Sequence, residues 1–337
     1  MPEIIRVHEL RKEFRRAKRA PGLIGALRTL FTRRYETTRA VDGVSFSLQE
    51  GELVGYLGRN GAGKSTTVKL LTGILHPTSG EVLVGGLVPW RERERNALNI
   101  GVVFGQRSQL WWDLPLRDSF DLISVMYRME KERYRRNLER FTDLLDMGPF
   151  MNTPVRQLSL GQRMRGDLVA AMLYEPRILY LDEPTVGLDV VAKDRIRTFI
   201  AETNRTEGTT VILTTHDMRD IERLCRRVIL IEAGQVLFDG AVSALVARYA
   251  PGRVLVLHLA DGTVEPALSG TELVRREGPQ VWLRFDPVAR PVAQLIAEAT
   301  QRYQVVDIAI EEPDLEQVVR HIFEERGEAG RARTVTG

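Results

Sequence analysis

The sequence ELVGYLGRNGAGKST at residues 52–66 decides the fold. Its first part, Glu52–Leu57, has the apolar content of a buried strand, and its second part fits the pattern G-x-x-x-x-G-K-[ST]. A helical pattern follows over Thr66–Leu75. Glycines between a strand and a helix let successive backbone N–H groups point at a phosphate chain, next to the positive end of the helix. The stretch therefore predicts a phosphate-binding loop in an α/β protein.

The chemistry of this loop assigns roles to its residues. Lys64 is expected to reach the β- and γ-phosphates of a nucleotide, and the Ser65 hydroxyl is expected to bind Mg²⁺. The residues expected to contact the nucleotide here are Gly58, Arg59, Asn60, Gly61, Ala62, Gly63, Lys64, Ser65 and Thr66. The loop alone does not distinguish GTPases, kinases, ATPases and DNA-processing machines.

A second candidate feature is the apolar run ILYLDEP at residues 178–184, which predicts a strand that ends in two carboxylates. Asp182 is expected to belong to the Mg²⁺ shell. Glu183 is expected to polarise the attacking water as a general base or an orienting group. Strands often end in acidic turns, so the meaning of this pair depends on the motifs on either side.

Those motifs stand in a fixed order. LSLGQR spans residues 158–163, GLD spans 187–189 and TTHD spans 214–217, and Gln106 follows an expected strand at Ile100–Phe104. Together with the phosphate loop they resemble the ABC ATPase family over residues 4–248. The resemblance implies ATP and Mg²⁺ as ligands and ATP hydrolysis as the activity. It also implies a P-loop NTPase core with a β subdomain and a helical subdomain at residues 107–160.

The resemblance carries further roles over to single residues. Ser159, Gly161 and Gln162 match the signature motif, whose residues contact the γ-phosphate held by a second copy of the chain. A helical pattern follows this motif, so it again presents a helix N-terminus to an anion. The family has glycine where this chain has Leu160, a departure that can weaken the motif.

Three other residues receive roles in the same way. Gln106 matches the glutamine that helps to hold Mg²⁺ and water, and His216 matches the switch histidine that contacts the γ-phosphate. Asp189 matches an aspartate at the dimer interface. Phe14 is the first candidate to stack on adenine and Tyr35 is the second, while core packing is an alternative role for Phe14.

Short β-rich runs alternate with helical patterns along the chain, which predicts a mixed α/β fold with helices over a sheet. We expect an ATP-binding domain at residues 1–248 and a small α+β accessory domain at residues 253–326, followed by a disordered tail at residues 327–337. The expected strands are 4–10, 44–48, 52–57, 100–104, 178–181, 211–214, 227–231, 236–239, 254–259, 281–285 and 305–311. Helices are expected at 129–146, 162–173, 291–303 and 315–326.

A basic insertion at residues 15–39 interrupts the first domain, and within it an amphipathic helix is expected after Pro21. Residues 1–39 hold 11 Lys and Arg against 4 Asp and Glu, a net charge of +7 within a chain of net charge +3. This region can face anionic lipid or nucleic acid, or can be a solvated loop with a helix packed on its own domain.

The composition agrees with a cytoplasmic protein. The 337 residues include one cysteine, Cys225, which excludes disulfides within the chain. No apolar run reaches the length of about 18 residues that a membrane-spanning helix needs, and the sequence that starts at Met1 lacks the layout of a secretory signal.

Two ABC functions compete. One is the motor of a membrane transporter, bound to an integral-membrane permease; the other is a soluble ABC ATPase that acts on nucleic acid or ribosomes. The first is favoured, because the chain has one cassette and neither long coiled coils nor zinc-binding cysteines. Trp111 and Trp112 follow Gln106, where transporters dock the membrane subunit, although core packing is an alternative role for both.

The segment 307–319 resembles the accessory tail of ATP-binding subunits from type-2 exporters. We therefore expect a peripheral protein on the inner face of the cell membrane that powers export. Its partners are a permease and a second copy of itself, which closes head to tail around two ATP·Mg²⁺, and a nucleic-acid partner is not expected.

Overall fold

The computed structural model describes residues 2–17, 35–105, 107–249, 252–264, 266–312 and 314–335. The expected amphipathic helix after Pro21 and the expected site residue Gln106 lie outside these ranges. The chain forms two compact units, Met1–Ala241 and Val242–Gly337, and the expected mixed α/β fold is confirmed. Among the described residues, no helix has both the length and the apolar composition needed to cross a bilayer.

The first unit is built on a six-stranded sheet with the order β5-β6-β7-β3-β8-β9. Its strands are β3 (Leu53–Gly58), β5 (Ile100–Phe104), β6 (Ile178–Asp182), β7 (Thr210–Thr214), β8 (Arg227–Glu232) and β9 (Gln235–Ala241). All pairings are parallel except that of β9, which is antiparallel to β8 at one edge. The apolar runs of β6 and β7 are buried, as expected for parallel strands covered on both faces.

A three-stranded antiparallel sheet with the order β2-β1-β4 lies beside it and contains β1 (Glu3–Ala17), β2 (Tyr35–Gln49) and β4 (Ser79–Val84). The alternating Val44, Phe46 and Leu48 are buried in one core with side chains of α2 (Lys64–Leu71) and of the larger sheet. Helix α2 therefore lies in a core that both sheets share.

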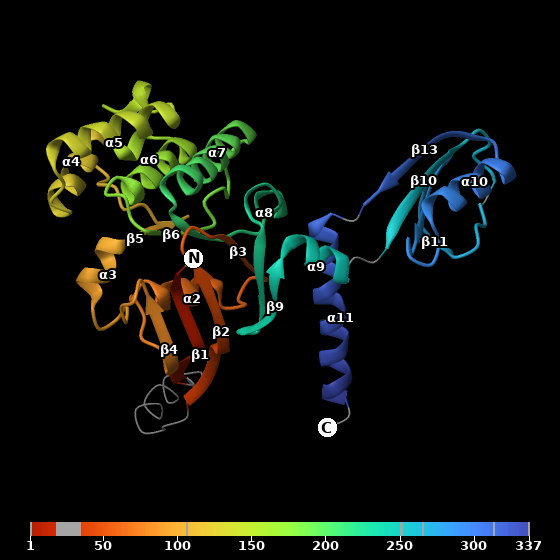
Figure 1. Cartoon of the computed structure of the whole chain (residues 1–337), viewed down its shortest axis with the longest axis horizontal. Coiled ribbons are helices and arrows are strands. Elements are labelled where there is room, and N and C mark those ends of the chain that lie inside the picture. Colours follow the sequence, from red (N-terminus) through yellow and green to blue (C-terminus); the bar gives the residue numbers. More distant parts are fainter. Residues whose placement is uncertain are drawn as a thin grey trace, which may run out of the picture. The chain divides into compact units, whose positions relative to one another are not determined.

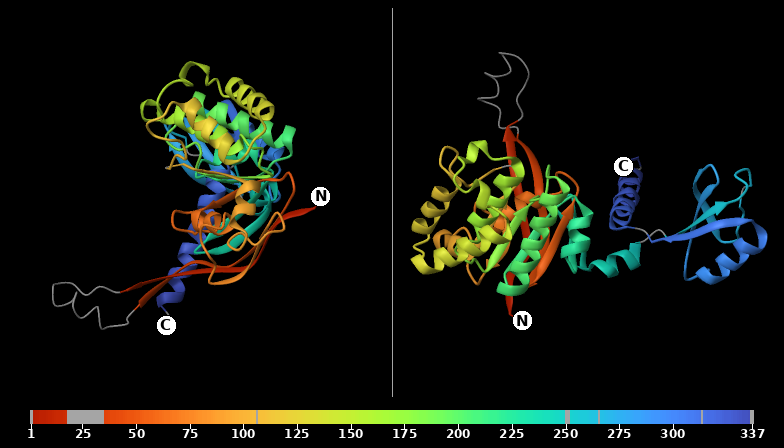
Figure 2. Two further views of the ribbon diagram at one scale, coloured as in Figure 1. Left: turned by 90° about the vertical axis from the view of Figure 1, so that its left-hand side faces the viewer. Right: turned by 90° about the horizontal axis from the view of Figure 1, so that it is seen from above.

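Strands β1 and β2 are longer than the sequence predicted, and Figure 2 shows them as a long hairpin that ends at the undescribed segment. Their pairing continues to Ala17 and Tyr35, so both ends of the expected insertion are strand. An ion pair between Arg39 and Glu13, 3.2 Å apart, and the β-branched Thr37 and Thr38 favour extended pairing there.

Helices α6 (Leu160–Met172), α7 (Val190–Glu207) and α8 (Met218–Leu224) belong to the opposite side of the sheet from α2 (Figure 1). Glycines permit the close approach: a Cβ at Gly55 of β3 would lie 2.6 Å from Ile221 of α8. A Cβ at Gly101 of β5 would lie 2.4 Å from the carbonyl oxygen of Ala171 in α6. The helical subdomain adds α4 (Leu116–Met126), α5 (Lys131–Leu144) and the 3₁₀ turns Gly148–Phe150 and Val155–Gln157, and α3 (Arg93–Asn99) precedes β5.

The second unit contains a four-stranded antiparallel sheet with the order β11-β12-β10-β13. Its elements are α9 (Val242–Tyr249), β10 (Arg253–Leu259), β11 (Thr271–Glu277), β12 (Gln280–Phe285), α10 (Val292–Arg302), β13 (Val305–Glu311) and α11 (Leu315–Val335). Leu295 and Ala299 of α10 are buried against apolar residues of β10 and β12, and α9 and α11 pack together.

Three features of this unit differ from the sequence prediction. Strand β11 was not expected, because it is an edge strand with mostly exposed residues and no clear apolar alternation. Helix α11 continues over residues 327–335, where we expected a disordered tail. Alanine and arginine are strong helix formers and offset the two glycines of this stretch. The compact unit begins at Val242, one helix before the boundary expected at residues 249–252.

Candidate active site

Three loops meet at one edge of the six-stranded sheet because β3, β6 and β7 are parallel neighbours and end on the same side. The phosphate loop (residues 58–65) follows β3. The Glu183 loop (residues 183–189) follows β6, and the His216 loop (residues 215–217) follows β7. Ligands of open α/β sheets bind at the carboxyl ends of the strands, so this edge is the candidate site.

The phosphate loop has the backbone that its glycines predict. Gly61 and Gly63 have φ angles of 83° and 109°, in the left-handed region. A Cβ at Gly63 would lie 2.3 Å from the carbonyl oxygen of Ala40. Only glycine fits there, and the loop runs directly into the start of α2, whose N-terminus favours an anion.

The hairpin between β8 and β9 braces the phosphate loop, which the sequence analysis did not predict. The N–H of Gly234 donates to the Ala62 carbonyl oxygen at 3.0 Å, and the Gly234 carbonyl oxygen accepts from the Asp42 N–H at 2.8 Å. Gly234 has a φ of 78°, typical of hairpin turns. The turn signal is visible in the sequence, but its contact with the phosphate loop depends on the tertiary fold.

Lys64 is 7% exposed, and its ammonium donates to the carbonyl oxygens of Gly58 at 2.7 Å and Arg59 at 3.3 Å. An ammonium has three donors, so one remains for a phosphate oxygen. Burial lowers the pKa of Lys64, while the nearby charges of Glu183 and Asp182 raise it.

Two of the three residues expected to hold Mg²⁺, Asp182 and Ser65, have chemistry that fits that ion, and the third, Gln106, lies outside the described residues. Asp182 ends β6, and Ser65 is the second residue of α2. Asp182 Oδ1 accepts a hydrogen bond from Thr214 Oγ1 at 2.5 Å, which orients the carboxylate. The described residues contain no cluster of three or more His, Cys, Asp or Glu side chains that could enclose a metal. Mg²⁺ is typically held by one or two carboxylates together with substrate phosphates, and the Asp182–Ser65 donor set matches that chemistry.

Glu183 and His216 lie against each other. His216 Nδ1 is 2.9 Å from Glu183 Oε2, and the Glu183 N–H donates to the Thr214 carbonyl oxygen at 2.9 Å. Glu183 has a φ of 57°, a left-handed conformation that is uncommon outside glycine. The structure therefore brings together the two residues that the sequence assigned to the attacking water and the γ-phosphate.

The signature residues 159–162 form the N-terminus of α6. The Ser159 hydroxyl accepts from the Gln162 N–H at 3.2 Å, while Gln162 Oε1 accepts from the Ser159 N–H at 2.9 Å. This reciprocal pair is a capping box, and it fixes where the helix begins. A helix N-terminus with its remaining N–H groups unpaired within the helix favours an anion.

The Glu183 loop lies beside this helix start. A Cβ at Gly187 would lie 3.0 Å from the Leu160 side chain, and a Cβ at Gly161 would lie 3.4 Å from that of Ala192 in α7. Asp189 caps α7, since its Oδ1 accepts from the Ala192 N–H at 2.8 Å. Leu160, which stands where the family has glycine, is thus accommodated over Gly187.

Exposed apolar side chains surround these residues and leave a surface suited to a partner. They are Leu160, Val186, Val190 and Val191, with 37%, 36%, 74% and 63% exposure.

The adenine candidates are on β1 and β2. Phe14 is 42% exposed on β1, and the Lys12 ammonium lies 5.2 Å from the centre of its ring. Phe14 is therefore not a core residue. Tyr35 begins β2, but its side chain lies outside the described residues, as does Gln106.

Residues 108–112, which follow Gln106, contact helix α6. Trp111 and Trp112 are 37% and 51% exposed, so neither is core. The Arg163 guanidinium of α6 lies 5.5 Å from the centre of the Trp112 ring. Asp167, one turn further along α6, accepts at Oδ1 from the Ser108 hydroxyl at 2.9 Å and the Gln109 N–H at 3.0 Å. The segment and the signature helix are thus directly joined, which the sequence did not predict.

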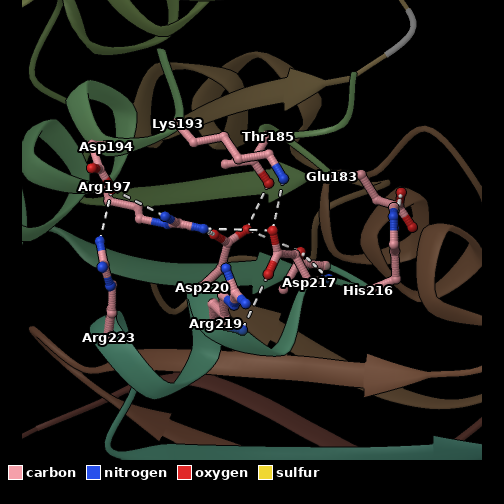
Figure 3. Close-up of polar contacts among 11 residues, drawn as sticks. Glu183, Thr185, Lys193, Asp194, Arg197, His216, Asp217, Arg219, Asp220 and Arg223 are labelled. Carbon is pink, nitrogen blue, oxygen red and sulfur yellow. Dashed lines mark hydrogen bonds and ion pairs between the residues drawn. The ribbon is translucent and has the colours of Figure 1, made fainter. Parts of the chain in front are cut away.

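A buried polar cluster between α7 and α8 was also missed (Figure 3). Its centre is Asp220, bonded to Thr185, Arg197 and Thr215. The only signal in the sequence is that polar residues alternate with apolar ones along these helices, and this pattern is equally typical of a solvated helix face.

Comparisons with known proteins identify the family. A family model described as "ABC transporter" matches residues 41–186. The daunorubicin resistance ATP-binding protein DrrA3 of Streptomyces coeruleorubidus is 30% identical over 302 residues, which cover 86% of this chain and 93% of that protein. The methionine import ATP-binding protein MetN of Latilactobacillus sakei is also 30% identical, over 304 residues that cover 86% of both chains.

Solved structures agree. The dimer of an ATP-binding cassette in a post-hydrolysis state, bound to ADP and Pi, superimposes with a TM-score of 0.58 and 25% identity over 70% of this chain and 98% of that one. The predicted P-loop NTPase fold is therefore confirmed. The chain belongs to the ABC transporter family and is one of its ATP-hydrolysing, ATP-binding proteins.

Proposed function

We propose that this chain is the motor subunit of a membrane exporter, and that two copies close head to tail around two ATP·Mg²⁺ to drive it. The observation that carries the proposal is that two elements of the chain are suited to a phosphate group. The phosphate loop lies with the Glu183–His216 pair at one sheet edge, and the N-terminus of α6, capped by Ser159, is the other.

Exposed apolar residues support the dimer. Val190 and Val191 stand directly after Asp189 and are the most exposed of the apolar side chains around the signature residues. Burying such a surface against a second copy is favourable, at about 25 cal/mol per Å² of apolar area. In that arrangement the N-terminus of one α6 covers the γ-phosphate held by the phosphate loop of the other copy.

The hydrolysis chemistry is positioning and charge stabilisation. Lys64 binds the β- and γ-phosphates, Glu183 orients and polarises the attacking water, and His216 holds Glu183 through Nδ1 and contacts the γ-phosphate. Asp182 and Ser65 are the residues that would hold Mg²⁺, which neutralises phosphate charge when bound.

The permease proposal rests on the exposed apolar surface of the helical subdomain. Trp111 and Trp112 lie in the segment joined to α6. Three side chains of α4 are exposed as well: Leu122, Val125 and Met126, at 39%, 74% and 65%. Aromatic anchors beside apolar residues suit a protein interface, and we place this surface against a permease on the inner face of the membrane.

Export is the preferred direction because the daunorubicin resistance relative matches nearly its whole length. Import is the second candidate, favoured by the methionine import relative. Inside-out vesicles that contain the chain and its permease distinguish the two, because an exporter accumulates its cargo inside them on addition of ATP and an importer depletes it.

The test of the motor is Glu183→Gln, with Glu139→Gln on the exposed face of α5 as the control. The Glu183 variant should bind ATP, lose most of its turnover and accumulate as a dimer with ATP in light scattering. The control should behave as the wild type. Unchanged turnover in Glu183→Gln would remove that residue from its role, and a strictly monomeric variant would refute the dimer.

The permease surface has its own test. A photo-crosslinker in place of Trp112, in membranes from the source cells, should attach to a protein with several membrane-spanning helices, whereas a crosslinker at exposed Glu139 should not. Attachment only to ribosomal proteins or nucleic acid would refute the transporter assignment.

A further inference from the structure

Asp220, on α8, has 0% exposure and is bonded on both carboxylate oxygens. Oδ1 accepts from Nε and Nη2 of Arg197 at 2.6 and 2.5 Å. Oδ2 accepts from the hydroxyl of Thr185 at 2.6 Å and from that of Thr215 at 3.1 Å. Burying a carboxylate is unfavourable unless it is paired and fully hydrogen-bonded, and Asp220 meets that condition through these three side chains.

The two hydroxyls belong to the two catalytic loops. Thr185 follows Glu183 by two residues, and Thr215 directly precedes His216. The loops have no strand pairing beyond Asp182 and Thr214, where β6 and β7 end. A single atom, Asp220 Oδ2, therefore binds both loops, and Figure 3 shows this cluster to one side of the contact between Glu183 and His216.

Glu183 needs such support because its backbone is in the left-handed region, with a φ of 57°. A non-glycine residue keeps that conformation only when its surroundings hold it. The Glu183 N–H is held by the Thr214 carbonyl oxygen on one side. Thr185, clamped to Asp220, holds the chain on the other side.

Arg197 holds Asp220 in place. It comes from α7, its side chain is 9% exposed, and it also pairs with Asp194 at 3.1 Å and Asp217 at 3.5 Å. Asp217 in turn accepts from Lys193 at 2.8 Å. The guanidinium occupies Oδ1, so that Oδ2 is left for the two threonines.

We propose that Asp220 is a positioning residue for ATP hydrolysis. By binding Thr185 and Thr215 with one oxygen, it fixes the spacing of Glu183 and His216, and with it the position of the attacking water. This inference rests on the proposed function of those two residues. Asp220 acts through the threonines and touches neither the nucleotide nor the water.

The rival explanation is that the cluster only stabilises the fold. The two explanations predict different effects on kcat when the cluster is broken. The phosphate loop is not part of the cluster, so loss of the clamp should lower kcat and leave the KM for ATP nearly unchanged. A purely stabilising cluster would lower the melting temperature and leave kcat per folded molecule unchanged.

The experiment uses isosteric variants of the full chain. Thr185→Val and Thr215→Val keep the side-chain shape and remove the hydroxyl, whereas Thr185→Ser and Thr215→Ser keep the hydroxyl. The matched control is Asp194→Asn, which removes another partner of Arg197 and touches neither loop. ATPase kinetics, nucleotide affinity and melting temperature are measured for each variant.

We expect kcat to fall about tenfold in each Val variant. Thr185→Val is the cleaner of the two, because Thr215→Val also loses the bond that the Thr215 hydroxyl accepts from the Asp217 N–H at 3.0 Å. The KM for ATP should change less than about twofold, and the Ser variants and Asp194→Asn should keep wild-type kcat. If Thr185→Val does not fold, Thr215→Val, which loses the longer of the two bonds, gives the same comparison.

Wild-type kcat in the Val variants, equal losses in the Val and Ser variants, or an equal loss in Asp194→Asn would overturn the proposal. These outcomes are separate from failure of the proposed function. An inactive wild type or a fully active Glu183→Gln would refute the ATPase assignment, whereas an inactive Glu183→Gln beside fully active Val variants would refute only the role of Asp220.

Discussion

The buried carboxyl group of Asp167 should make the free energy of unfolding depend on pH. Asp167 is 5% exposed on α6. Burial raises its pKa from the ordinary value of 3.8 to about 6, although the hydrogen bonds from Gln109 and Ser108 and the charge of Arg163 lower it. A pKa difference of one between the folded and unfolded chain corresponds to about 1.4 kcal/mol. Keeping this carboxylate ionised in the folded chain therefore costs about 3 kcal/mol.

The sign follows from proton binding. Between pH 4 and 6 the folded chain holds this proton and the unfolded chain does not, so the contribution of Asp167 to the free energy of unfolding falls as pH rises and levels off above about 6. Asp167→Asn removes the ionisation, and its amide oxygen can still accept from Ser108 and Gln109. The stability of the variant relative to the wild type should therefore rise by about 2 kcal/mol from pH 4.5 to 7.5.

The assay is urea unfolding at a series of pH values, followed by tryptophan fluorescence. Three of the four tryptophans lie in the first unit, and Trp282→Phe in every protein removes the signal of the second unit. The exposed Asp143→Asn on α5 is the control for replacing an aspartate in solvent. A difference between Asp167→Asn and wild type that stays constant across this pH range would refute the burial argument.

Two further predictions concern nucleotide binding. Gly63→Ala places a Cβ 2.3 Å from the Ala40 carbonyl oxygen at a φ of 109°, so calorimetry should detect an ATP affinity that is weaker by about tenfold or more. The control is Gly148→Ala, whose Cβ meets nothing within 4 Å. Wild-type affinity in Gly63→Ala would contradict the loop geometry. Ser159→Ala removes the cap of α6, which costs about 1 kcal/mol of stability. It should lower kcat without changing the affinity of one chain for ATP, whereas Ser159→Thr should keep both values. A weaker affinity with unchanged kcat would mean that Ser159 contacts the nucleotide of its own chain, which contradicts the proposed dimer.

Prediction from the sequence succeeded where local pattern and spacing are enough. The strand–loop–helix order around Lys64 and the two buried strands that end at Asp182 and Thr214 follow from residue type alone. The contact of Glu183 with His216 was not predicted; it arises because β6 and β7 are parallel neighbours that end at one edge. Prediction failed where a contact joins distant segments, because no local pattern in the sequence says which buried polar residue meets which loop.

Asp167 and Asp220 both make such contacts, and both do so for the same physical reason. Each is a buried carboxylate on a helix, and each accepts hydrogen bonds from irregular segments: residues 108–109 for Asp167, and the Glu183 and His216 loops for Asp220. An irregular segment has no ladder of backbone partners, so its position depends on side-chain acceptors.

A carboxylate is a costly acceptor to bury but offers about four lone-pair sites, and it can hold two donors in a fixed relation. A neutral hydroxyl in either place would hold fewer donors less firmly. One carboxylate joins the segment before Trp111 and Trp112 to the helix that begins at Ser159, and the other joins the Glu183 loop to the His216 loop. The unfavourable burial is thus found where two segments that are far apart in the sequence are held together.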